Sequence, residues 1–589
     1  MKTFIFIFFL TITSISYSQN EYLLGESYYR EGEYEKATQV YKKLFSKSPF
    51  NTAYLSRLIS CYQETNQYLE AEKLLKSKIK KNPEQGFFYV YLGYNYERQQ
   101  LKELAEKNYK LALSSLDKSV AYGGITGRTF KDYNLLDNAI LAYEKVMEEN
   151  ENSNYGFQIA QIYGEKGDFK KMFESYINLV DKTESYVSLV QRYTSLYITD
   201  DSENEANILF RKTLLRKSAS KPKDIWNRLL SWLFTQQKDY GKAFIQEKAL
   251  YQRDSNSLNA IYSLGKIAFD NKNYDEAKEC FDFITLKSTF KEEKIAAALY
   301  ISKIAVATND SETENIFESL FNEFGKNTQT LKLQVAYADY LTFQKNNPNE
   351  AKAILENALP FSESKFDKAR IKLKLGDILV FTEKYNKALI YFSQIQTQLK
   401  NHELAQQARF KVAQTSYFKG DFTWAKAQLK VLKGSTTQLI ANDALELFLI
   451  ITDNEPVDSI PSGLKQYSKA ALLAFQNKTQ QAIDTLSLIN KDFKGQPIED
   501  EALFEQAKLY IKQNQFEAAI VNFEKVIALN PEGILIDDAY YELAELYKNQ
   551  LKNPEKASEY YQKIIFDYSS SIYLVDARKK YRKIRGDKV

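Results

Sequence analysis

The sequence has few of the residues that carry nucleophilic or metal chemistry. Among 589 residues there is one histidine, His402, and there are two cysteines, Cys61 and Cys280. A Ser-His-Asp or Cys-His arrangement would have to be built on His402, for which the residues around it favour a surface or capping role. One histidine and two cysteines far apart cannot complete a tetrahedral zinc site. We expect no metal, and both cysteines should be small core residues.

A glycine-rich loop for phosphate or dinucleotide binding is also missing. Gly123-Gly124 lies between expected helices and lacks the Lys-Ser/Thr that follows in a phosphate-binding loop. The acidic residues, 76 in all, lie mostly on polar helix faces and at helix starts, as in Asp275-Glu276. No stretch of about 100 residues is left for a separate catalytic domain. The sequence predicts a protein that is not an enzyme and needs no cofactor.

No excess of one charge exists. The 80 basic and 76 acidic residues give a net charge of +4 and are spread along the chain. A nucleic-acid-binding protein concentrates its positive charge on one face, so no nucleic-acid partner is expected.

The sequence has no apolar run long enough for a transmembrane helix. The run Phe4–Ile12 has nine residues, against roughly 20 for a membrane-spanning helix. It follows Lys2, and Ser16-Tyr17-Ser18 offers small residues before Gln19, a pattern typical of a cleaved signal peptide at 1–18. No cysteine near the cleavage point could carry a lipid. We expect an exported protein whose mature chain has no transmembrane span.

Ten prolines and twenty glycines are few for this length and suit helices joined by short turns. Within Leu24–Pro49, glycine, alanine and aromatic residues recur at helical spacings, and a similar unit ends 34 residues later at Pro83. The small residue of the second helix in each unit marks the period. It occurs at Ala37, Ala71, Ala105, Ala139, Met172, Ala206, Ala243 and Ala277. Gly25, Gly93, Gly127 and Gly265 occupy the matching close-approach site of the first helix.

The period changes along the chain and predicts two arrays. Residues 19–290 follow a 34-residue period, and residues 291–570 follow a period of about 37, which we attribute to longer turns. The step from Ala425 to Ala482 is 57 residues and indicates an additional helix at 439–451 and a loop at 452–461, within an irregular segment at 435–462. Residues 571–589 are expected to form a basic capping helix and tail.

A 34-residue period of two amphipathic helices, with small residues at fixed places and a closing proline, resembles the tetratricopeptide repeat (TPR). The resemblance implies an all-α solenoid, a right-handed superhelix of antiparallel helix pairs. The first helix of each pair, helix A, would line a concave groove that holds a protein partner. Carried over position by position, the groove residues are Tyr22, Glu26, Tyr29, Tyr94, Glu97, Arg98, Tyr262, Lys266, Phe269, Gln414, Tyr417, Tyr541, Glu545 and Lys548.

The closing region, with Asp538–Ala544 and Asp576–Lys579, is similar to envelope TPR proteins of Gram-negative bacteria. This resemblance implies a periplasmic scaffold or adaptor whose partners are components of an envelope or outer-membrane complex. A polysaccharide- or cell-wall-binding module that uses the same aromatic groove is the alternative. The set of Lys, Asn and Arg with which TPR proteins clamp a terminal carboxylate is not assembled in any single repeat.

Two short features leave alternatives open. The last residues are rich in Lys and Arg, which suits a solvated cap on the final repeat or a contact for an anionic surface. Asp458-Ser459-Ile460 resembles an acceptor pattern for bacterial O-glycosylation at Ser459. The basic residues are Arg578, Lys579, Lys580, Arg582, Lys583, Arg585 and Lys588.

Overall fold

The computed structural model describes residues 21–587 with gaps at 151–152, 256, 433–437 and 457–461. The expected signal peptide, Ser459 and Lys588 lie outside the described residues. Contacts divide the chain into two compact units, Met1–Gln237 and Lys238–Val589, called here the N-terminal and C-terminal units. The expected boundary at 290 comes from the repeat period, not from contacts, and stays a prediction. The described residues form helices and contain no strand.

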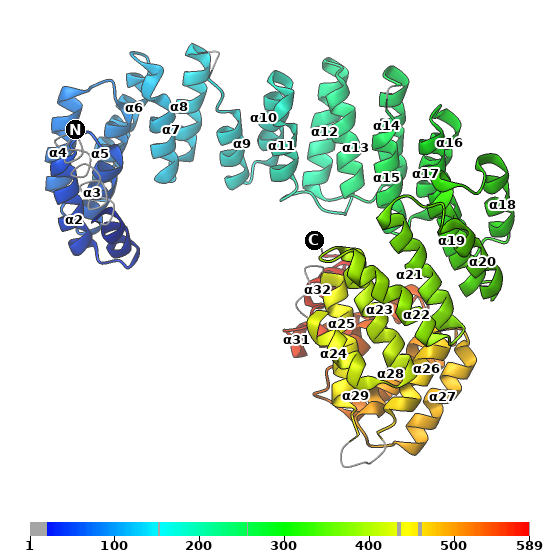
Figure 1. The fold of residues 1–589 in the computed structure, drawn as a ribbon. Helices are drawn as coiled ribbons and strands as arrows, with labels where there is room; N and C mark the ends of the chain where they lie inside the picture. The colour runs from blue at the N-terminus through cyan, green and yellow to red at the C-terminus, as the bar shows by residue number, and fades with distance from the viewer. Residues whose placement is uncertain (1–20, 151–152, 256, 433–437, 457–461, 588–589) are drawn as a thin grey trace, which may run out of the picture. The chain divides into compact units, whose positions relative to one another are not determined.

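The N-terminal unit is a row of antiparallel helix pairs (Figure 1). Residues 21–30 are helical and pack as the first helix A. Helix A of the later pairs is an odd-numbered helix and helix B an even-numbered one. The helices are α2 (Tyr34–Lys47), α3 (Thr52–Glu64), α4 (Tyr68–Lys81), α5 (Gly86–Glu97), α6 (Lys102–Ser115), η1 (Val120–Tyr122), α7 (Gly123–Asp132), α8 (Leu136–Glu149), α9 (Gly156–Glu165), α10 (Phe169–Lys182), η2 (Glu184–Tyr186), α11 (Val187–Thr194), α12 (Glu205–Ser220) and α13 (Asp224–Gln236).

The C-terminal unit continues the pairing, with one irregularity at α25. Helix A is α15, α17, α19, α21, α23, α26, α28 or α30. The helices are α14 (Tyr240–Arg253), α15 (Asn259–Asp270), α16 (Tyr274–Lys287), α17 (Lys291–Ala307), α18 (Thr313–Phe324), η3 (Thr328–Thr330), α19 (Leu331–Phe343), α20 (Pro348–Ala358), α21 (Lys365–Phe381), α22 (Tyr385–Gln398), α23 (Glu403–Lys419), α24 (Phe422–Leu432), α25 (Gln438–Asp453), α26 (Leu464–Phe475), α27 (Thr479–Asp492), α28 (Ile498–Lys512), α29 (Phe516–Leu529), α30 (Ile536–Asn549), α31 (Pro554–Asp567) and α32 (Leu574–Arg585).

The small residues that mark the repeat lie where two helices approach most closely. Ala37, Ala71 and Ala139 have no exposed surface. A Cβ atom added to Gly93 would lie 2.4 Å from the Tyr109 ring, and no side chain fits there without moving that ring. The expected close approach of helices A and B is confirmed.

The turn from helix A to helix B requires a left-handed backbone. The residue at this turn has a φ of 78° at Gly32, 59° at Asn66, 65° at Gln100, 59° at Asn134 and 75° at Gly167. The same position therefore recurs in five consecutive pairs, but glycine, which adopts this conformation without strain, occupies it only twice.

The longer period of the later repeats arises partly from longer A helices and partly from the expected longer turns. The turn between α29 and α30 has six residues, whereas that between α2 and α3 has four. Helices α21 and α23 have 17 residues each, whereas α3 and α5 have 13 and 12. The turn between α22 and α23 has the same length as that between α2 and α3. In the repeats of α21 and α23 the extra residues thus lengthen the surface of helix A.

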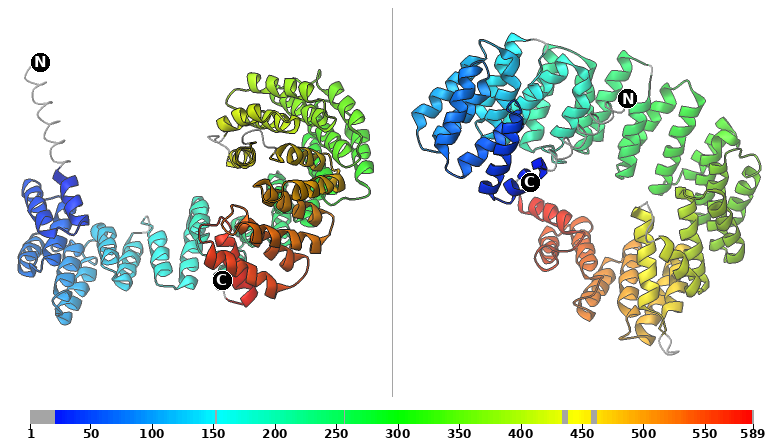
Figure 2. Two further views of the ribbon diagram at one scale, coloured as in Figure 1. Left: turned by 90° about the horizontal axis from the view of Figure 1, so that it is seen from below. Right: turned by 60° about the vertical axis from the view of Figure 1, so that its left-hand side comes forward.

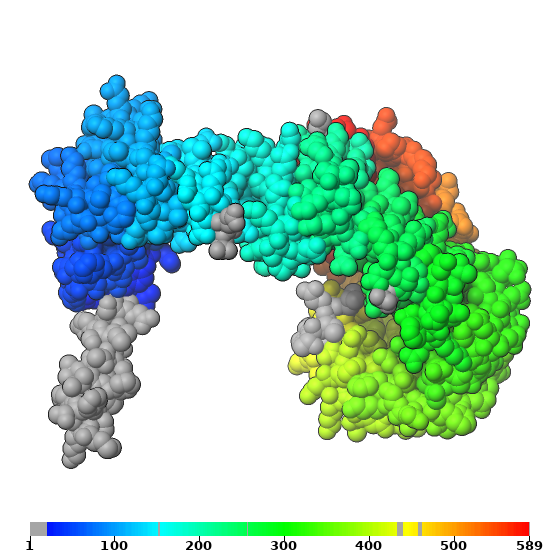
Figure 3. All heavy atoms as spheres, turned by 90° about the horizontal axis from the view of Figure 1, so that it is seen from above, coloured from blue at the N-terminus to red at the C-terminus, as the bar shows by residue number. Residues whose placement is uncertain are grey.

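Within each unit the pairs stack in sequence order, as the two further views show (Figure 2). Side chains fill the spaces between the ribbons, so neighbouring pairs form a continuous surface (Figure 3). In the N-terminal unit one buried cluster extends from Ala37 to Ile162 and joins successive pairs.

The C-terminal unit departs from simple stacking at α25. Helix α25 covers the segment for which an additional helix is expected, and it packs on α24 and α23. Helix α26 also packs on α23. Phe475, at the end of α26, lies 5.3 Å from Phe343 of α19 and 5.7 Å from Phe418, measured between ring centroids. Gln476 Nε2 donates a hydrogen bond to the carbonyl oxygen of Phe381 at 2.9 Å. Pairs far apart in the sequence are therefore joined directly.

None of the helices in the described part of the chain combines the length and the apolar character needed to cross a membrane.

Candidate partner-binding surface

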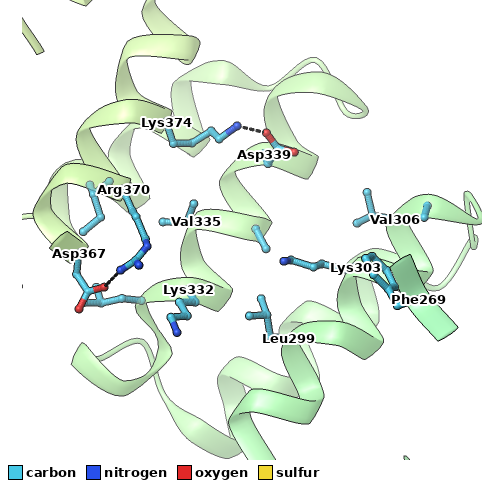
Figure 4. A pocket seen from close by; sticks show the side chains of 14 residues that line it. Phe269, Leu299, Lys303, Val306, Lys332, Val335, Asp339, Asp367, Arg370 and Lys374 are labelled. Carbon is cyan, nitrogen blue, oxygen red and sulfur yellow. Dashed lines mark hydrogen bonds and ion pairs between the residues drawn. The ribbon is translucent and has the colours of Figure 1, made fainter. Parts of the chain in front are cut away.

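The clearest cavity on a helix-A surface lies in the C-terminal unit (Figure 4). It has a volume of about 480 Å³, within the range of small-ligand and side-chain pockets. Four successive A helices, α15, α17, α19 and α21, line it. No helix B contributes a lining residue. The pocket thus runs across several repeats on the surface that the sequence analysis expects to hold a partner.

The floor of the pocket is apolar. Leu331 and Ile371 are buried beneath it, and Leu299, Val306 and Val335 are half-buried along its walls. Apolar side chains that remain partly open to solvent can bury more area when a partner covers them. The floor therefore offers hydrophobic contact to a side chain of suitable size.

Two lysines in this pocket have no carboxylate partner. Among the described residues neither Lys303 nor Lys332 forms an ion pair, and both side chains are exposed. Lys303 extends toward the centre of the pocket (Figure 4), and its ammonium group lies 5.2 Å from the Tyr300 ring centroid. The surrounding protein removes water from Lys303 and lowers its pKa. An anionic group on a partner would stabilise the positive charge of Lys303.

The other charges of the pocket are already paired. Arg370 and Asp367 form an ion pair of 2.8 Å, and Lys374 contacts Asp339 and, at 3.4 Å, Asp377. Burial alone would lower the pKa of Lys374, but Asp377 and Asp339 outweigh burial and raise it. Lys374 therefore remains charged and holds α19 and α21 together.

Of the predicted groove residues, only Phe269 lines this pocket. Tyr262 and Phe269 both pack against Tyr300 of the next helix A, with ring centroids 5.8 and 5.3 Å away. Lys266, from the same helix, is exposed. The predicted groove residues therefore share one helix, α15, with this pocket and include none of its lining residues on α17, α19 and α21.

The first predicted set is engaged within the N-terminal unit. Glu26 accepts hydrogen bonds from Arg57 Nε at 2.7 Å and from Tyr41 Oη at 2.6 Å. Burial raises the pKa of Glu26, but Arg57 and Tyr41 outweigh it and the net shift is downward. Tyr29 lies under the Arg57 guanidinium at 4.6 Å, and Tyr22 packs edge-on against Tyr41. These side chains join consecutive repeats.

The second predicted set is engaged in the same way. All three residues contact a neighbouring helix rather than standing free above the groove. Tyr94 stacks on Tyr133 with centroids 4.0 Å apart, Glu97 accepts a hydrogen bond of 2.5 Å from Tyr109 Oη, and Arg98 pairs with Glu64 at 3.2 Å.

Tyr417 lies in the core rather than on the surface of a groove. Only 2% of it is exposed, and it belongs to a buried cluster that also contains Leu464 and Tyr467 of α26, a helix that packs on α23. A partner cannot reach this ring, which corrects its assignment as a groove residue. Gln414, three residues earlier, is half-buried and accepts a hydrogen bond from Lys411 at 3.3 Å.

The last predicted set is joined to the terminal helix α32. Lys580 donates hydrogen bonds to Tyr541 Oη at 2.8 Å and to Glu545 at 2.7 Å. Tyr541 in turn donates to Asp576 at 2.6 Å, and burial lowers the pKa of Lys548 beside them. Lys580, one of the basic residues of the terminal segment, therefore holds α32 on α30.

Lys303 of α17 and Lys332 and Val335 of α19 were not among the predicted groove residues. One signal was available. Lys332, Val335 and Asp339 are spaced three and four residues apart, which places them on one face of a helix.

Among the described residues that line this pocket there is no His or Cys. The His402 ring accepts a hydrogen bond from the Leu404 amide at 3.1 Å and caps α23, as expected for a capping residue. Cys61 and Cys280 are buried, free thiols, and burial raises their pKa values to about 11 and about 12. In the described ranges no group of three or more His, Cys, Asp or Glu side chains is arranged to hold a metal ion.

Comparison with known proteins gives one family. Tetratricopeptide-repeat models match residues 19–50, 258–282, 500–532 and 538–571, which lie in both units. No curated protein matches the chain.

The similar solved structures share little sequence with this chain. Yeast Tom70 is 13% identical with a TM-score of 0.32, covering 79% of this chain and 99% of that chain. The Naa15/Naa10 structure bound to HypK-THB is 12% identical with a TM-score of 0.28, covering 97% and 96%. A tetratricopeptide repeat protein from Parabacteroides merdae ATCC 43184 is 17% identical with a TM-score of 0.25, covering 49% and 97%.

Proposed function

We propose that this tetratricopeptide-repeat protein is an exported scaffold of the bacterial cell envelope that holds a protein partner in the pocket of α15, α17, α19 and α21. A repeat solenoid of this kind suits protein–protein interaction because successive repeats build one extended surface. The finer parts of the proposal, export and an envelope partner, rest on the sequence pattern at residues 1–18 and on the likeness of the closing region to envelope TPR proteins.

One observation carries the proposed location. The pocket combines an apolar floor with two lysines that lack carboxylate partners. Near the N-terminus, in contrast, Glu26 is paired with Arg57 and Arg98 is paired with Glu64. A partner residue that buries apolar area there would gain about 25 cal/mol per Å². An adjacent acidic group on the partner would pair with Lys303.

Crosslinking in living cells tests this location. A photo-reactive residue would replace Leu299 or Val335 in the full chain, and adducts would be identified by mass spectrometry. The matched control is Leu286, on helix B of the same unit, which is 75% exposed and lies outside the pocket. We expect one protein partner from both pocket positions and none from Leu286.

The other outcomes are equally informative. Adducts from Leu286 but not from Leu299 or Val335 would contradict the location. No protein adduct at any position, together with binding to wall or glycan preparations that is lost when Tyr262 is changed to Ala, would favour the polysaccharide alternative. Recovery of the partner from the cytoplasmic fraction alone would contradict export.

A further inference from the structure

The last helix of the C-terminal unit, α32, has one face against the protein and one face in solvent. The inner face packs on α31, with Ala577 buried and Tyr581 and Ile584 half-buried. The outer face carries cations at intervals of three or four residues, which places them on one side of the helix. The exposed cations of α32 are Arg578, Lys579, Arg582, Lys583 and Arg585.

Contacts of the inner face hold α32 in a set orientation. Lys580, which is half-buried, donates hydrogen bonds to Tyr541 and Glu545 of α30 and pairs with Asp576 at 2.8 Å. Tyr573, just before α32, stacks on Tyr541 with ring centroids 4.1 Å apart. The remaining cations of the helix therefore stay directed toward solvent.

The acids of this segment leave the outer face positively charged. The α32 sequence contains six basic residues and one acid, Asp576, which is engaged by Lys580. Asp587, after the helix, lies 3.5 Å from Arg585. Three cations of the outer face form no ion pair with any residue that the structure describes, and these are Arg578, Arg582 and Lys583.

Large apolar side chains project from the turn that leads into α32. Phe566, at the end of α31, is 73% exposed, Ile572 is 85% exposed, and Val575, in the first turn of α32, is 78% exposed. Within the described chain seven large apolar side chains are more than 70% exposed, and three of the seven lie in residues 566–575. Singly scattered apolar residues are normal on a protein surface, but such a concentration marks an interaction site.

The apolar side chains distinguish between the two interpretations of the basic terminus. A solvating cap needs charged and polar side chains and gains nothing from an exposed Phe, Ile and Val. An anionic bilayer uses both kinds of side chain. Cations attract its headgroups, and apolar side chains enter the boundary between headgroups and acyl chains. Projecting side chains suit this soft boundary, whereas the anchors of protein partners are usually received in pockets.

We propose that the outer face of α32 and the turn before it bind an anionic lipid surface. The cations of α32 contact the lipid headgroups, and Phe566, Ile572 and Val575 enter the interface beside them. The proposal stands independently of the pocket on α15–α21 and of the protein partner.

Vesicle flotation tests the proposal on residues 19–589, which exclude the apolar run near the N-terminus. Vesicles of phosphatidylglycerol mixed with phosphatidylcholine are compared with vesicles of phosphatidylcholine alone. Wild type should bind only the anionic vesicles, and more weakly as the NaCl concentration rises. Each cation near an anionic membrane contributes about fivefold to partitioning, so a triple variant should bind about a hundredfold more weakly. The triple variant is Arg578→Gln, Arg582→Gln and Lys583→Gln.

The same unit offers a matched control for the loss of charge. Lys384→Gln, Lys387→Gln and Lys430→Gln remove three exposed cations from the region of α22 and α24. This control has the same net charge as the α32 variant and should bind like wild type. Circular dichroism verifies that both variants are folded, which is expected because all six side chains are exposed.

A fluorophore tests the apolar contact separately. Ile572→Cys is labelled with an environment-sensitive dye, and Cys61 and Cys280 stay unlabelled in the folded protein because they are buried. The emission should shift to shorter wavelength on anionic vesicles and be quenched by brominated lipid. Leu286→Cys, at a 75% exposed position on α16 of the same unit, is the control and should not respond.

Four results would overturn the proposal. The first is equal partitioning of wild type and the α32 variant. The second is an equal loss in the Lys384/Lys387/Lys430 control, which would show a response to net charge alone. The third is unchanged emission at position 572 while vesicles are bound. The fourth is binding to soluble polyglutamate but not to vesicles, which would identify an acidic protein surface as the partner.

Discussion

The two units use the same helix pair and differ in what their helix-A side chains contact. In the N-terminal unit Glu26 pairs with Arg57, and Arg98 pairs with Glu64, so neighbouring repeats satisfy each other. In the C-terminal unit Lys303 and Lys332 have no carboxylate partner among the described residues. The place of a residue in the repeat therefore does not by itself show that the residue can bind a partner. The side chains of the neighbouring repeat determine whether it is already engaged within the protein.

The units also differ in the range of their contacts. In the C-terminal unit Asn477 Nδ2 donates to the carbonyl oxygen of Phe343, 134 residues away. In the N-terminal unit the described side-chain hydrogen bonds reach no further than Tyr133 to Gln63, 70 residues apart. Repeats that contact only neighbours can unfold locally, whereas repeats joined across the array should unfold together.

The largest effect is expected from removing the contacts by which Phe475 connects distant repeats. Phe475→Ala removes the ring that lies between Phe343 and Phe418. It should lower the free energy of unfolding by about 2–3 kcal/mol, below the roughly 3–5 kcal/mol for a fully buried ring, because Phe475 is only half-buried. Urea unfolding gives the magnitude, and hydrogen exchange should rise in both α19 and α23. The control is Phe361→Ala, which changes a 71% exposed ring in the same unit. Hydrogen exchange that rises in α26 alone would contradict the claim that Phe475 connects α26 with α19 and α23.

A matched change in the N-terminal unit should remain local. Gly93→Ala puts a methyl group 2.4 Å from the Tyr109 ring and should destabilise by about 1–3 kcal/mol through overpacking. Hydrogen exchange should rise in α5 and α6 and stay unchanged in the C-terminal unit. Gly241→Ala, in α14 with nothing within 4 Å of the added atom, should be neutral or stabilising. Exchange that rises throughout the N-terminal unit would show that its repeats unfold together.

The pH dependence of stability should single out Glu501. The folded-state pKa of Glu501 is about 8, above the ordinary value of 4.5. The unfolded chain therefore loses this proton first, and Glu501 lowers stability progressively as pH rises from about 4.5 to 8. Relative to wild type, Glu501→Gln should gain at least about 1.4 kcal/mol between pH 5 and pH 8, the equivalent of one pKa unit.

Urea unfolding at pH 5, 6.5 and 8 measures this difference. The control is Glu276→Gln, because the neighbouring carboxylate in the same helix turn, Asp275, is exposed. A difference between Glu501→Gln and wild type that stays constant over this pH range would contradict the raised pKa of Glu501.

The smallest effect concerns the turn from helix A to helix B. Gln100 has a φ of 65°. Gln100→Gly should stabilise the N-terminal unit by about 0.5 kcal/mol. The reason is that the relief of left-handed backbone strain slightly exceeds the cost of the added entropy of the unfolded chain. Lys107→Gly, inside α6, should instead destabilise by about 1 kcal/mol. Thermal unfolding compares the two, and a loss of stability in both would show that Gln100 is not strained.

The repeat pattern predicted the helix pairs and their close approaches from local spacing alone. The small residues at Ala37 and Gly93 could be recognised because every pair needs them at the same place. The burial of Tyr417 could not be predicted, since it depends on α26 packing on α23 after an interruption by α25. That Lys303 has no carboxylate partner among the described residues could not be predicted either, because this depends on which side chains of the adjacent helices lie near it.

The most direct test of the central claim compares two charge reversals in the same cells. One variant carries Lys303→Glu and Lys332→Glu in the pocket, and the other carries Lys102→Glu and Lys107→Glu on the exposed face of α6. Quantitative mass spectrometry measures the partner crosslinked through position 335 in each. The account predicts that the pocket variant loses most of the adduct while the α6 variant keeps it. Equal yields in both variants, with both proteins folded, would contradict the claim that the unpaired lysines of the C-terminal unit hold the partner.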